Sequence, residues 1–535
     1  MKTDCLPFSS IPHSPPLFLD FVHNFDKVRE FYARPTTFAE WWKDELQHIR
    51  YPQPRRQKVA EILERQNRKF GSGARTLENI QRLKNGAPAI VTGQQVALFG
   101  GPMFVVLKGL TTVLLAEKAG AVPVFWLATE DHDLAEVNFV HIPAGDHLET
   151  FTTNPPHPQN APVGVIAFND EISTLLQRME QQFGSSEVLT LLQESYRPGE
   201  TFGSAFGKFY AQLFADLGIV LLDPSDPELH VVAAPVYSDA LRRSSAINDA
   251  LAERHKELEK AGYDAQVKVT PSHTLCFYLQ QGARLPIRQH AAGSDQGFLL
   301  GEKEFSHNDL VTETGVNPEH FSANVLLRPV IQDYLLPTLC YVGGPSEISY
   351  FAQVQVVYQM LLGRVTPIVP RLSATVVEPR MAKLLERYQL TLPEIFRGPE
   401  KLRDYLAGKA LPESIMKSFD AAAEHLEQAI GLVHGPLGKL DATLLDAAEN
   451  AAGKMRYQLQ SLREKAARAE ARKNTEVQRH ADELSTQLYP NKTLQEREVG
   501  SAYFLLKYGN GTLQQLRDKL QLGCLEHQIV ELQKG

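Results

Sequence analysis

The sequence predicts an α/β protein with a doubly wound parallel sheet and, in the C-terminal half of the chain, an α-helical coiled coil. Short runs rich in β-branched and aromatic residues alternate with longer apolar segments of helical spacing, which is the order that a parallel sheet requires. Several of these runs end directly in glycine or polar side chains, as strands do beside a ligand crevice. Beyond about residue 380, apolar residues recur at intervals of three and four over long stretches, which indicates paired helices.

Length and composition indicate a globular protein with two or three structural units. Its 535 residues exceed what one ordinary core holds, and 43% hydrophobic and 22% charged residues are typical of globular chains. The net charge of −8 argues against a general nucleic-acid binder, whose surface should be basic. No apolar run approaches the roughly 20 residues that span a membrane, and the N-terminus has no apolar secretion signal. We therefore expect neither nucleic acid nor a membrane as partner.

The cysteines favour a reducing compartment. Cys5, Cys276, Cys340 and Cys524 are far apart in sequence, and no CxxC pair is present to bind zinc. Because their spacing suggests no disulfide framework, we expect a cytoplasmic protein. Cys276 and Cys340 stand in apolar surroundings, which raise the pKa of a thiol, so we expect neither to be a nucleophile.

The first half of the predicted sheet lies within residues 1–142. Helical spacing dominates the first eighty or so residues, and APAIVTGQQ at 87–95 then predicts a strand that ends in glycine and two glutamines. A glycine-rich turn at 100–102 precedes an apolar helix that Gly120 closes. AVPVFWLATEDHD at 121–133 predicts the next buried strand, which completes a β–turn–α–β unit.

Two insertions interrupt the predicted sheet. Irregular polar segments break the α/β pattern, and the second of them is rich in candidate strands. We expect N-terminal helices and the first half of the core at 1–142, a first insertion at 143–200, core at 201–261, a second insertion at 262–320, core at 321–380, a helical coiled-coil hairpin at 381–490, and a C-terminal segment packing on the core at 491–535.

Two helical stripes predict the hairpin. Apolar residues at 415–433 and at 444–477 recur at intervals of three and four, on either side of a break at Gly435-Pro436. The alternative is that both helices merely pack on the core. Highly charged flanks favour a projecting hairpin whose apolar seam a second subunit covers, so we expect a homodimer through the coiled coil.

The turn after the first strand is a candidate ligand loop. Backbone N–H groups at Gly100 and Gly101, at a helix start, could face a phosphate or carboxylate with help from the helix dipole. The spacing matches neither a GxGxxG fingerprint nor a GxxxxGK[ST] loop, and a tight turn that needs glycine is an equal alternative. Gln94 and Gln95 favour a ligand, because adjacent amides at a strand end suit hydroxyl, amide or carboxylate partners.

Four ionisable side chains, Glu130 to Asp133, follow the second buried strand without a spacer. The zinc spacing HExxH is absent, so we expect no zinc, whereas Mg²⁺ held by one or two carboxylates and a phosphate stays open. An acid/base or amine-binding role is equally open, because a neighbouring carboxylate tunes the pKa of the His132 imidazole. A solvated loop is less favoured, since these residues end a buried strand.

Two arginines in apolar segments need anionic partners. Arg328 lies inside VLLRPVIQDYLLP, which also contains Asp333, and Arg371 follows TPIVP. A guanidinium in such surroundings must find a carboxylate or an anionic ligand.

Gly343 and Gly344 form a second glycine-rich turn at a helix start. Ser346 is a good N-cap for that helix and Glu347 complements its dipole, so a structural role explains both well. We keep Gly343, Gly344 and Ser346 among the candidate nucleotide-binding residues, because such a turn also suits a phosphate.

At these motifs the chain resembles the BshC family, the cysteine ligases of bacillithiol biosynthesis. The most specific matches are GQQ at 93–95 with Gly101-Pro102, FWLATEDHDLAEVNFV at 125–140, FSANVLLRPVIQDYLLPTL at 321–339, GGPSEISYF at 343–351 and LKYGNG at 506–511, and the likeness covers essentially the whole chain. The resemblance implies a Rossmann-like core with two connecting insertions and a helical coiled coil that dimerises.

The resemblance implies that cysteine is joined through its carboxyl group to the amine of glucosaminyl-malate. A carboxylate must be activated before an amine displaces its oxygen, as an acyl phosphate or an adenylate, so we expect ATP or ADP, with Mg²⁺ as a candidate ion. The anionic sugar-malate suits bidentate pairing with Arg328 and Arg371. The candidate proton acceptors are Asp131, His132 and Asp133, and the candidates for holding the cysteine ammonium are Glu130 and Asp133.

Three groups of candidate site residues follow. The catalytic candidates are Glu130, Asp131, His132 and Asp133; the substrate-binding candidates are Gln94, Gln95, Asn138, Arg328, Asp333 and Arg371; the nucleotide-binding candidates are Gly93, Gly100, Gly101, Lys108, Gly343, Gly344, Ser346 and Tyr508. A nucleotidyl-transfer enzyme akin to class I aminoacyl-tRNA synthetases is a competing interpretation, disfavoured because no HIGH or KMSKS-like motif is present. A coiled-coil scaffold with a vestigial pocket is another, disfavoured by the charged strand ends.

Overall fold

The computed structural model describes residues 4–289, 297–409, 413–471 and 475–533. The chain divides into two compact units, which are described separately. The first comprises residues 1–142, 150–376 and 496–535, and the second comprises residues 143–149 and 377–495.

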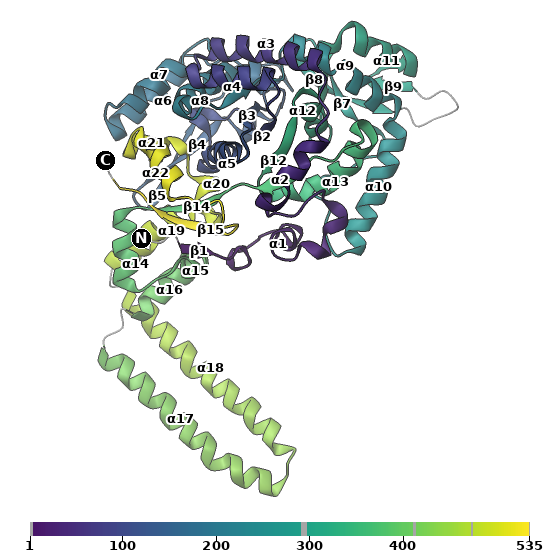
Figure 1. The fold of residues 1–535 in the computed structure, drawn as a ribbon. Coiled ribbons are helices and arrows are strands. Elements are labelled where there is room, and N and C mark those ends of the chain that lie inside the picture. Colours follow the sequence, from purple (N-terminus) through teal and green to yellow (C-terminus); the bar gives the residue numbers. More distant parts are fainter. Residues whose placement is uncertain (1–3, 290–296, 410–412, 472–474, 534–535) are drawn as a thin grey trace. The chain divides into compact units, whose positions relative to one another are not determined.

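A five-stranded parallel sheet forms the centre of the first unit (Figure 1). Its order is β13-β12-β2-β3-β6, and every adjacent pair is parallel. The strands are short runs of β-branched and aromatic residues that are almost entirely buried, because helices or loops cover both faces. Their bounds are Ala89–Gln94 for β2, Val122–Leu127 for β3, Val220–Leu222 for β6, Thr338–Gly343 for β12 and Ile368–Pro370 for β13.

The direction of strand addition reverses next to β2. The chain passes from β2 through α5 (Met103–Ala119) to β3 on one side, whereas β12 is added later on the other side of β2 and continues through α13 (Pro345–Leu362) to β13. The carboxyl ends of β2 and β12 therefore border a crevice of the kind in which doubly wound sheets bind ligands. The doubly wound parallel sheet predicted from the sequence is confirmed.

Helices pack on this sheet through their apolar faces. α5 is apolar almost all round, packs on β2, β3 and β12, and ends where Gly120 adopts a left-handed conformation with φ of 63°. α3 (Gln53–Phe70) packs on β6, and α4 (Ala74–Lys84) packs on β3 and β6. The other helices outside the coiled-coil region are α1 (Pro16–His23), α2 (Phe38–Glu45), α6 (Glu171–Phe183), α7 (Glu187–Ser195), α8 (Phe202–Leu213), α9 (Pro227–Arg242), α10 (Ser244–Lys260), α11 (His307–Val316), α12 (Arg328–Leu335), α20 (Gln495–Glu498), α21 (Ser501–Tyr508) and α22 (Gly511–Lys519).

A second sheet of the first unit is antiparallel, in the order β10-β9-β8-β7-β11. Its middle strand β8 carries Arg284, whose guanidinium donates to the hydroxyl of Ser322 at 3.0 Å and to the carbonyl of Ala323 at 2.6 Å on β11. The bounds are His273–Gln280 for β7, Ala283–Gln289 for β8, Gly297–Leu300 for β9, Lys303–Ser306 for β10 and Phe321–Ala323 for β11; a separate hairpin pairs β4 (Phe139–Ala144) with β5 (His147–Thr152).

A third sheet brings together distant parts of the chain, in the order β1-β15-β14. β1 (Asp4–Leu6) pairs antiparallel with β15 (His527–Glu531), and β14 (Ser373–Val377) lies on the other side of β15. The hydroxyls of Ser373 and Thr375 on β14 each lie 2.8 Å from a ring nitrogen of the fully buried His527. Buried polar contacts therefore fix β15 to the segment that follows the central sheet.

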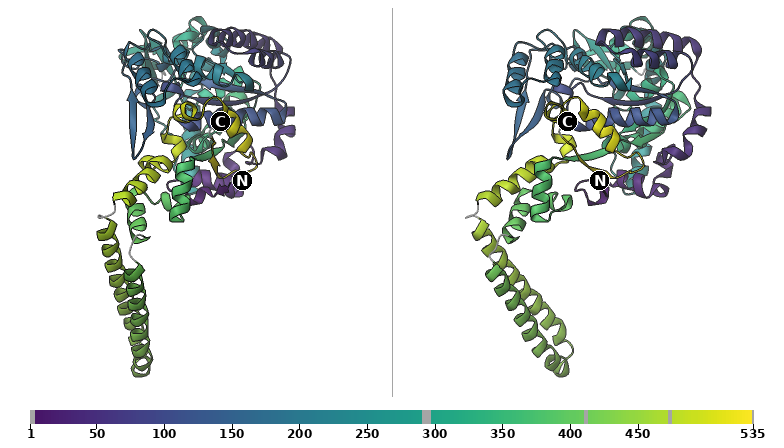
Figure 2. Two further views of the ribbon diagram at one scale, coloured as in Figure 1. Left: turned by 90° about the vertical axis from the view of Figure 1, so that its left-hand side faces the viewer. Right: turned by 60° about the vertical axis from the view of Figure 1, so that its left-hand side comes forward.

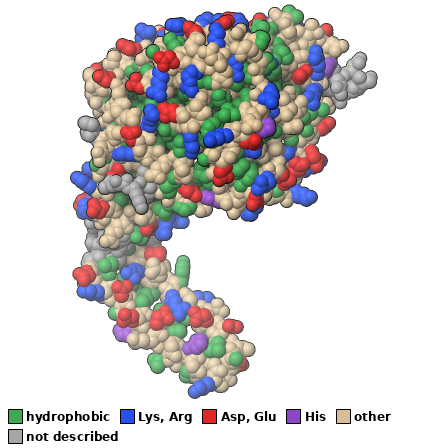
Figure 3. All heavy atoms as spheres, viewed as in Figure 1, with side chains coloured by type: hydrophobic (Ala, Val, Ile, Leu, Met, Phe, Trp, Pro, Cys, Tyr) green, Lys and Arg blue, Asp and Glu red, His purple; other side chains and the backbone are tan. Residues whose placement is uncertain are grey.

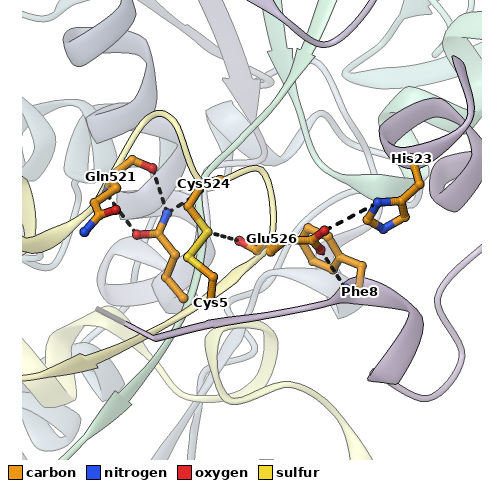
Figure 4. Close-up of a disulfide and its surroundings, with 7 residues drawn as sticks. Cys5, Phe8, His23, Gln521, Cys524 and Glu526 are labelled. Carbon is orange, nitrogen blue, oxygen red and sulfur yellow. Dashed lines mark hydrogen bonds and ion pairs between the residues drawn. A yellow bond between two sulfur atoms is a disulfide. The ribbon is translucent and has the colours of Figure 1, made fainter. Parts of the chain in front are cut away.

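A disulfide joins Cys5 to Cys524 beside the pair of terminal strands (Figure 4), across 519 residues of sequence. The expectation that the cysteines form no disulfide is wrong for this pair. The antiparallel pairing of β1 with β15 brings these two cysteines together, and spacing along the chain cannot reveal such a tertiary contact. Cys276 and Cys340 are free and buried, and burial raises the pKa of each thiol.

Two long helices dominate the second unit. α17 (Glu413–Leu440) and α18 (Leu444–Ala471) run side by side in opposite directions in every view (Figures 1 and 2), and the ion pair Arg456–Glu427 links them at 2.7 Å. This is the helical hairpin that the apolar stripes predict. The remaining helices of the unit are α14 (Pro379–Tyr388), α15 (Leu392–Ile395), α16 (Pro399–Lys409) and α19 (Thr475–Leu488).

The expected break at Gly435-Pro436 does not occur. α17 continues through both residues and ends at Leu440, so the turn lies at residues 441–443. Proline inside a helix leaves the carbonyl four residues earlier without a partner. That carbonyl belongs to Leu432, which is 77% exposed, so water can satisfy it and the helix continues.

Apolar side chains remain exposed along the hairpin (Figure 3). Leu432, Leu440, Met455, Tyr457 and Leu462 are each more than half exposed. A second subunit would cover such a seam, and the homodimer stays a prediction. Among the described residues, no helix is both long and apolar enough to cross a bilayer.

Candidate functional site

A cavity of about 540 Å³ lies at the carboxyl ends of β2, β3 and β12, in the crevice of the central sheet. Two clusters of charged side chains line it. The cationic cluster comprises Lys108, Arg328, Arg371 and Arg497 with the carboxylate of Glu347, and the acidic cluster comprises Glu130, Asp131 and Glu136.

The adjacent amides at the end of β2 connect the two clusters. Gln94 accepts a hydrogen bond from Nζ of Lys108 at 3.0 Å, whereas Nε2 of Gln95 donates to Asp131 at 2.6 Å and to Glu136 at 2.7 Å. Successive residues of an extended chain point in opposite directions, so neighbouring glutamines reach different clusters. Both line the cavity, where the sequence places them.

Lys108 is the buried centre of the cationic cluster. α5 carries its side chain, which is 3% exposed, to the end of β2, where Nζ donates to the carbonyl of Gly93 at 2.8 Å and lies 2.5 Å from Oε2 of Glu347. Burial lowers the pKa of Lys108 to about 8, although the Glu347 carboxylate raises it in part. Lys108 is thus held beside the glycine of the strand end rather than free in solvent.

Glu347 lies where the second glycine-rich turn meets α13. The helix begins at Pro345 with Gly344 as its N-cap, so Ser346 is not the N-cap that the sequence suggests. Glu347 accepts hydrogen bonds from the N–H of Gly344 at 2.7 Å and from the hydroxyl of Tyr341 at 2.6 Å. Burial raises its pKa, but Lys108 and these donors outweigh burial and hold the pKa below its usual value.

The three arginines complete the cationic cluster. Arg328 donates to the hydroxyl of Tyr350 at 3.2 Å and lines the cavity. Arg371 is 3% exposed and pairs with the fully buried Glu496 at 2.6 Å, and its Nε has no hydrogen-bond partner among the described residues. Arg497 follows Glu496 and is exposed at the cavity. Because a buried N–H without a partner is costly, Arg371 is suited to donate to an anion in the cavity.

The acidic cluster follows β3. Glu130 is 12% exposed, and its Oε1 lies 3.3 Å from Nε2 of His230, which α9 carries and which is 3% exposed. Burial raises the pKa of Glu130, although His230 and Arg284 lower it in part. Asp131 differs, because Gln95 and the backbone N–H of His132 both donate to its carboxylate. Donors of this kind stabilise the charged form of a carboxylate.

Arg284 fixes the state of His132. Its Nη1 lies 3.0 Å from Nδ1 of His132, and a guanidinium can only donate. Nδ1 is therefore an acceptor, and His132 is neutral with its proton on Nε2. Burial and the neighbouring Arg284 lower the pKa of His132, which agrees with this state. His132 lies beside the cavity but is not part of its lining.

Several predicted site residues lie outside the cavity lining. The N–H of Gly100 approaches the hydroxyl of Tyr196 at 3.0 Å, and that of Gly101 donates to a backbone carbonyl, so their glycine turn serves the fold. Asn138 bonds to Asn154, and Asp333 accepts from Tyr358. Asp133, Gly343 and Tyr508 are likewise absent from the lining, whereas Gly93, Gly344 and Ser346 are part of it.

Sequence reasoning missed residues that the fold brings to the cavity. Arg284 comes from the second sheet and Arg497 from the C-terminal segment, whereas His230 on α9 contacts Glu130 from outside the lining. No local motif marks these positions, although Arg284 is a charged residue next to an apolar run, a signal related to the one that indicates Arg328. Glu347 was assigned a structural role from its place in the first helical turn. It fulfils that role and also lines the cavity.

The arrangement can hold an elongated polar molecule with an anionic group at one cluster and an amine at the other. Carboxylates or phosphates suit the cationic cluster, and an ammonium or a nucleophilic amine suits the acidic one. Among the described residues, no three His, Cys, Asp or Glu side chains are grouped so that they could hold a metal ion. Mg²⁺ therefore remains an expectation that depends on a bound phosphate.

Comparison with known proteins gives matches over nearly the whole chain. Residues 1–372 match the family model described as "Bacillithiol biosynthesis BshC, N-terminal Rossmann-like domain", and residues 374–532 match "Bacillithiol biosynthesis BshC, C-terminal coiled-coil domain". A relative from Koribacter versatilis is 44% identical over 99% of this chain and 100% of its own. Relatives from Solibacter usitatus and Salinibacter ruber are 34% and 31% identical, over 99% and 98% of this chain and 100% and 97% of theirs. All three carry the name "Putative cysteine ligase BshC".

Proposed function

This chain belongs to the BshC family of bacillithiol biosynthesis, and on that premise we propose that it joins the carboxyl group of L-cysteine to the amine of glucosaminyl-malate to give bacillithiol. The observation that carries the proposal is one cavity with a cationic and an acidic cluster, connected by Gln94 and Gln95. The sugar substrate has the matching chemistry, with two carboxylates on malate and one amine on glucosamine.

The cationic cluster suits the malate group. Arg328 and Arg371 each present a guanidinium at the cavity, and a guanidinium pairs with a carboxylate through two parallel hydrogen bonds. Nε of Arg371 has no partner among the described residues, so a carboxylate there would satisfy it.

The acidic cluster suits the amine and the cysteine ammonium. Asp131 accepts hydrogen bonds from two N–H donors and can also pair with an ammonium group. Glu130 lies deeper and has an oxygen free of hydrogen bonds among the described residues. The amine must be neutral when it attacks, so the cluster must also accept a proton.

ATP or ADP fits the donor set of the same cavity. Arg497 and the first turn of α13 at Ser346 are the residues that would face its phosphates. Lys108, whose three N–H groups bond to Gly93, Gln94 and Glu347, would contribute its positive charge. A bound nucleoside triphosphate would supply the activation that the cysteine carboxylate needs. Mg²⁺, a homodimer formed through α17 and α18, and a cytoplasmic location remain predictions.

The experiment is a product assay. The purified protein receives ¹³C-labelled cysteine, glucosaminyl-malate, Mg²⁺ and one of four nucleoside triphosphates, and mass spectrometry detects a thiol product of bacillithiol mass. N-acetylglucosaminyl-malate is the control, because its blocked amine should give none. Absence of product with every nucleotide, while calorimetry shows that cysteine and glucosaminyl-malate bind, would overturn the proposal and favour another ligation or nucleotidyl transfer.

A further inference from the structure

We propose that Glu130 is the catalytic residue that accepts the proton of the attacking amine, and that His230 is the positioning residue that holds Glu130 for this step. The inference rests on the proposed function for the identity of the amine. It differs from what the sequence suggests, because the sequence favours Asp131, His132 or Asp133 as the proton acceptor and assigns no role to His230.

Glu130 and His230 form a buried pair at the cavity. Oε1 of Glu130 and Nε2 of His230 are 3.3 Å apart, and the two side chains are 12% and 3% exposed. Within the described part of the chain, neither Oε1 of Glu130 nor Nδ1 of His230 has a hydrogen-bond partner. Tyr237 stacks on the His230 ring at 6.2 Å and fixes its plane. A carboxylate that lines a cavity with few donors is free to accept a proton from a ligand.

The neighbouring candidates are engaged in other contacts. Nδ1 of His132 accepts from Arg284, and its Nε2 already carries the proton, so the ring cannot accept another without losing Arg284. Asp131 accepts hydrogen bonds from Gln95 and from the backbone N–H of His132, so its carboxylate is already engaged. Asp133 is exposed and lies outside the cavity lining. Oε1 of Glu130 is buried against His230, so Oε2 is the oxygen left to accept a proton from a ligand. Glu130 is thus the member of the four-residue motif that lines the cavity without accepting a hydrogen bond from the described residues.

Electrostatics supports the same assignment. Burial raises the pKa of Glu130, and the charged or titratable groups that act on it are His230, Arg284, Asp223 and Tyr237. His230 and Arg284 lower the pKa of Glu130, whereas Asp223 raises it. Glu130 is therefore a stronger base than an exposed glutamate, and its partner His230 offsets part of the rise in its pKa.

The proton and electron balance of the step is simple. The amine nitrogen attacks the activated carbonyl carbon of cysteine and forms the C–N bond, while one N–H proton passes to the Glu130 carboxylate. The leaving group departs with the electron pair of its bond to carbon. The proton then leaves Glu130 for the leaving group or for water, which restores the carboxylate.

Variants test the assignment in the ligation assay. Glu130→Gln should lower kcat by about 10²- to 10⁴-fold, the usual contribution of general base catalysis, with the affinity for glucosaminyl-malate changed less than a few-fold. His132→Gln keeps an acceptor for Arg284 and an N–H donor, so it should retain rates within about tenfold. Glu194→Gln, at an exposed site away from the cavity, is the matched control. A fully active Glu130→Gln, or an inactive His132→Gln, overturns the proposal.

The positioning role of His230 has its own readout. His230→Phe keeps the stack on Tyr237 but removes the group that lowers the pKa of Glu130. The acidic limb of the kcat/KM profile should therefore move to higher pH. His230→Gln keeps an N–H donor, so its acidic limb should lie between those of His230→Phe and the wild type. An unchanged profile in His230→Phe would show that His230 only fills space.

A chemical probe separates this inference from the proposed function. Dicyclohexylcarbodiimide modifies protonated buried carboxyls, and peptide mapping locates the label in the free protein over a pH series. Glu130 should be labelled at acidic pH in the wild type, and its labelling should extend to higher pH in His230→Phe. If no ligation occurs but this labelling pattern is found, the proposed function is wrong, whereas the coupling of His230 to the Glu130 carboxylate is supported. If ligation occurs but Glu130 is labelled over the same pH range in the wild type and in His230→Phe, the positioning role of His230 is wrong.

Discussion

Lys108 and Glu347 form a buried ion pair, with Nζ and Oε2 2.5 Å apart, between two helices that follow different strands of the central sheet. Lys108 also donates to the carbonyl of Gly93 at the end of β2, and Glu347 accepts from the N–H of Gly344 after β12. The pair therefore connects the two strand ends that border the cavity. It fixes their spacing and places a cation and an anion in surroundings from which water is largely excluded.

The first prediction is that stability rises with pH between about 8 and 10.5 through Lys108. Burial lowers the pKa of Lys108 from 10.5 to about 8, and Glu347 offsets only part of this. In that window the unfolded chain binds more protons than the folded chain, so the free energy of unfolding increases with pH. At 1.36 kcal/mol per pKa unit the gain is on the order of 3 kcal/mol. Urea unfolding at pH 7, 8, 9 and 10 measures it.

Lys108→Met is the control for this prediction, because methionine fills a similar volume and does not titrate. Other lysines and tyrosines contribute equally to both proteins, so the difference between the two pH profiles isolates Lys108. Parallel profiles for the wild type and Lys108→Met would contradict a lowered pKa at this site.

The second prediction concerns recognition of the malate group. Arg328→Lys keeps a positive charge but loses the planar fork that binds a carboxylate through two hydrogen bonds. Affinity for glucosaminyl-malate should fall about ten- to a hundredfold, which corresponds to roughly 1.4–2.8 kcal/mol. Isothermal titration calorimetry measures the change, with methyl glucosaminide, which lacks malate, as the control ligand. An equal loss of affinity for both ligands would show that Arg328 does not bind the malate group.

The fold was largely predictable because its signals are local. The runs that became β2, β3 and β12 are short, apolar and bounded by glycine or polar residues, and burial on both faces explains that composition. The prediction of a helix break at Gly435-Pro436 is wrong for a reason that the sequence does not contain. Whether proline ends a helix depends on how the orphaned carbonyl is solvated, and on α17 that carbonyl belongs to an exposed residue.

The site was predictable where its residues end strands or, like Arg328, carry a charge within an apolar segment. Gln94, Gln95 and Glu130 follow β2 and β3 and line the cavity, as expected for carboxyl ends of parallel strands. Arg284 and His230 come from the antiparallel sheet and from α9, and their approach to Glu130 is a tertiary contact with no sequence period. The Cys5–Cys524 disulfide is not predictable from the sequence for the same reason, because it too is a tertiary contact.

The third prediction is that the exposed seam of the hairpin mediates dimerisation. Met455 and Leu462 are 51% and 57% exposed and lie seven residues apart on α18, so they share one face of a coiled coil. Replacing both with glutamate should shift the protein from dimer to monomer in sedimentation velocity. Gln458→Glu, at an exposed position between them, is the control for added charge. A dimer that survives the double substitution would place the interface elsewhere.

Leu459 calls for a separate expectation. It lines a small cavity between the two helices, together with Phe419 and Leu426, and is only partly exposed. Leu459→Glu should therefore loosen the hairpin itself, which circular dichroism would detect as an earlier loss of helix on heating. This distinguishes a lost interface from a lost hairpin.

The last prediction is that the Cys5–Cys524 disulfide stabilises the protein. A link between the two terminal strands constrains the unfolded chain over nearly its full length, and removing a native disulfide typically costs about 2–5 kcal/mol. Cys5→Ser should lower the thermal unfolding midpoint of the oxidised protein, and adding dithiothreitol should bring the wild type to the same value. Reductant should leave Cys5→Ser unchanged, because Cys276 and Cys340 are free. Equal midpoints for oxidised wild type and Cys5→Ser would show that the link adds nothing to the pairing of β1 with β15.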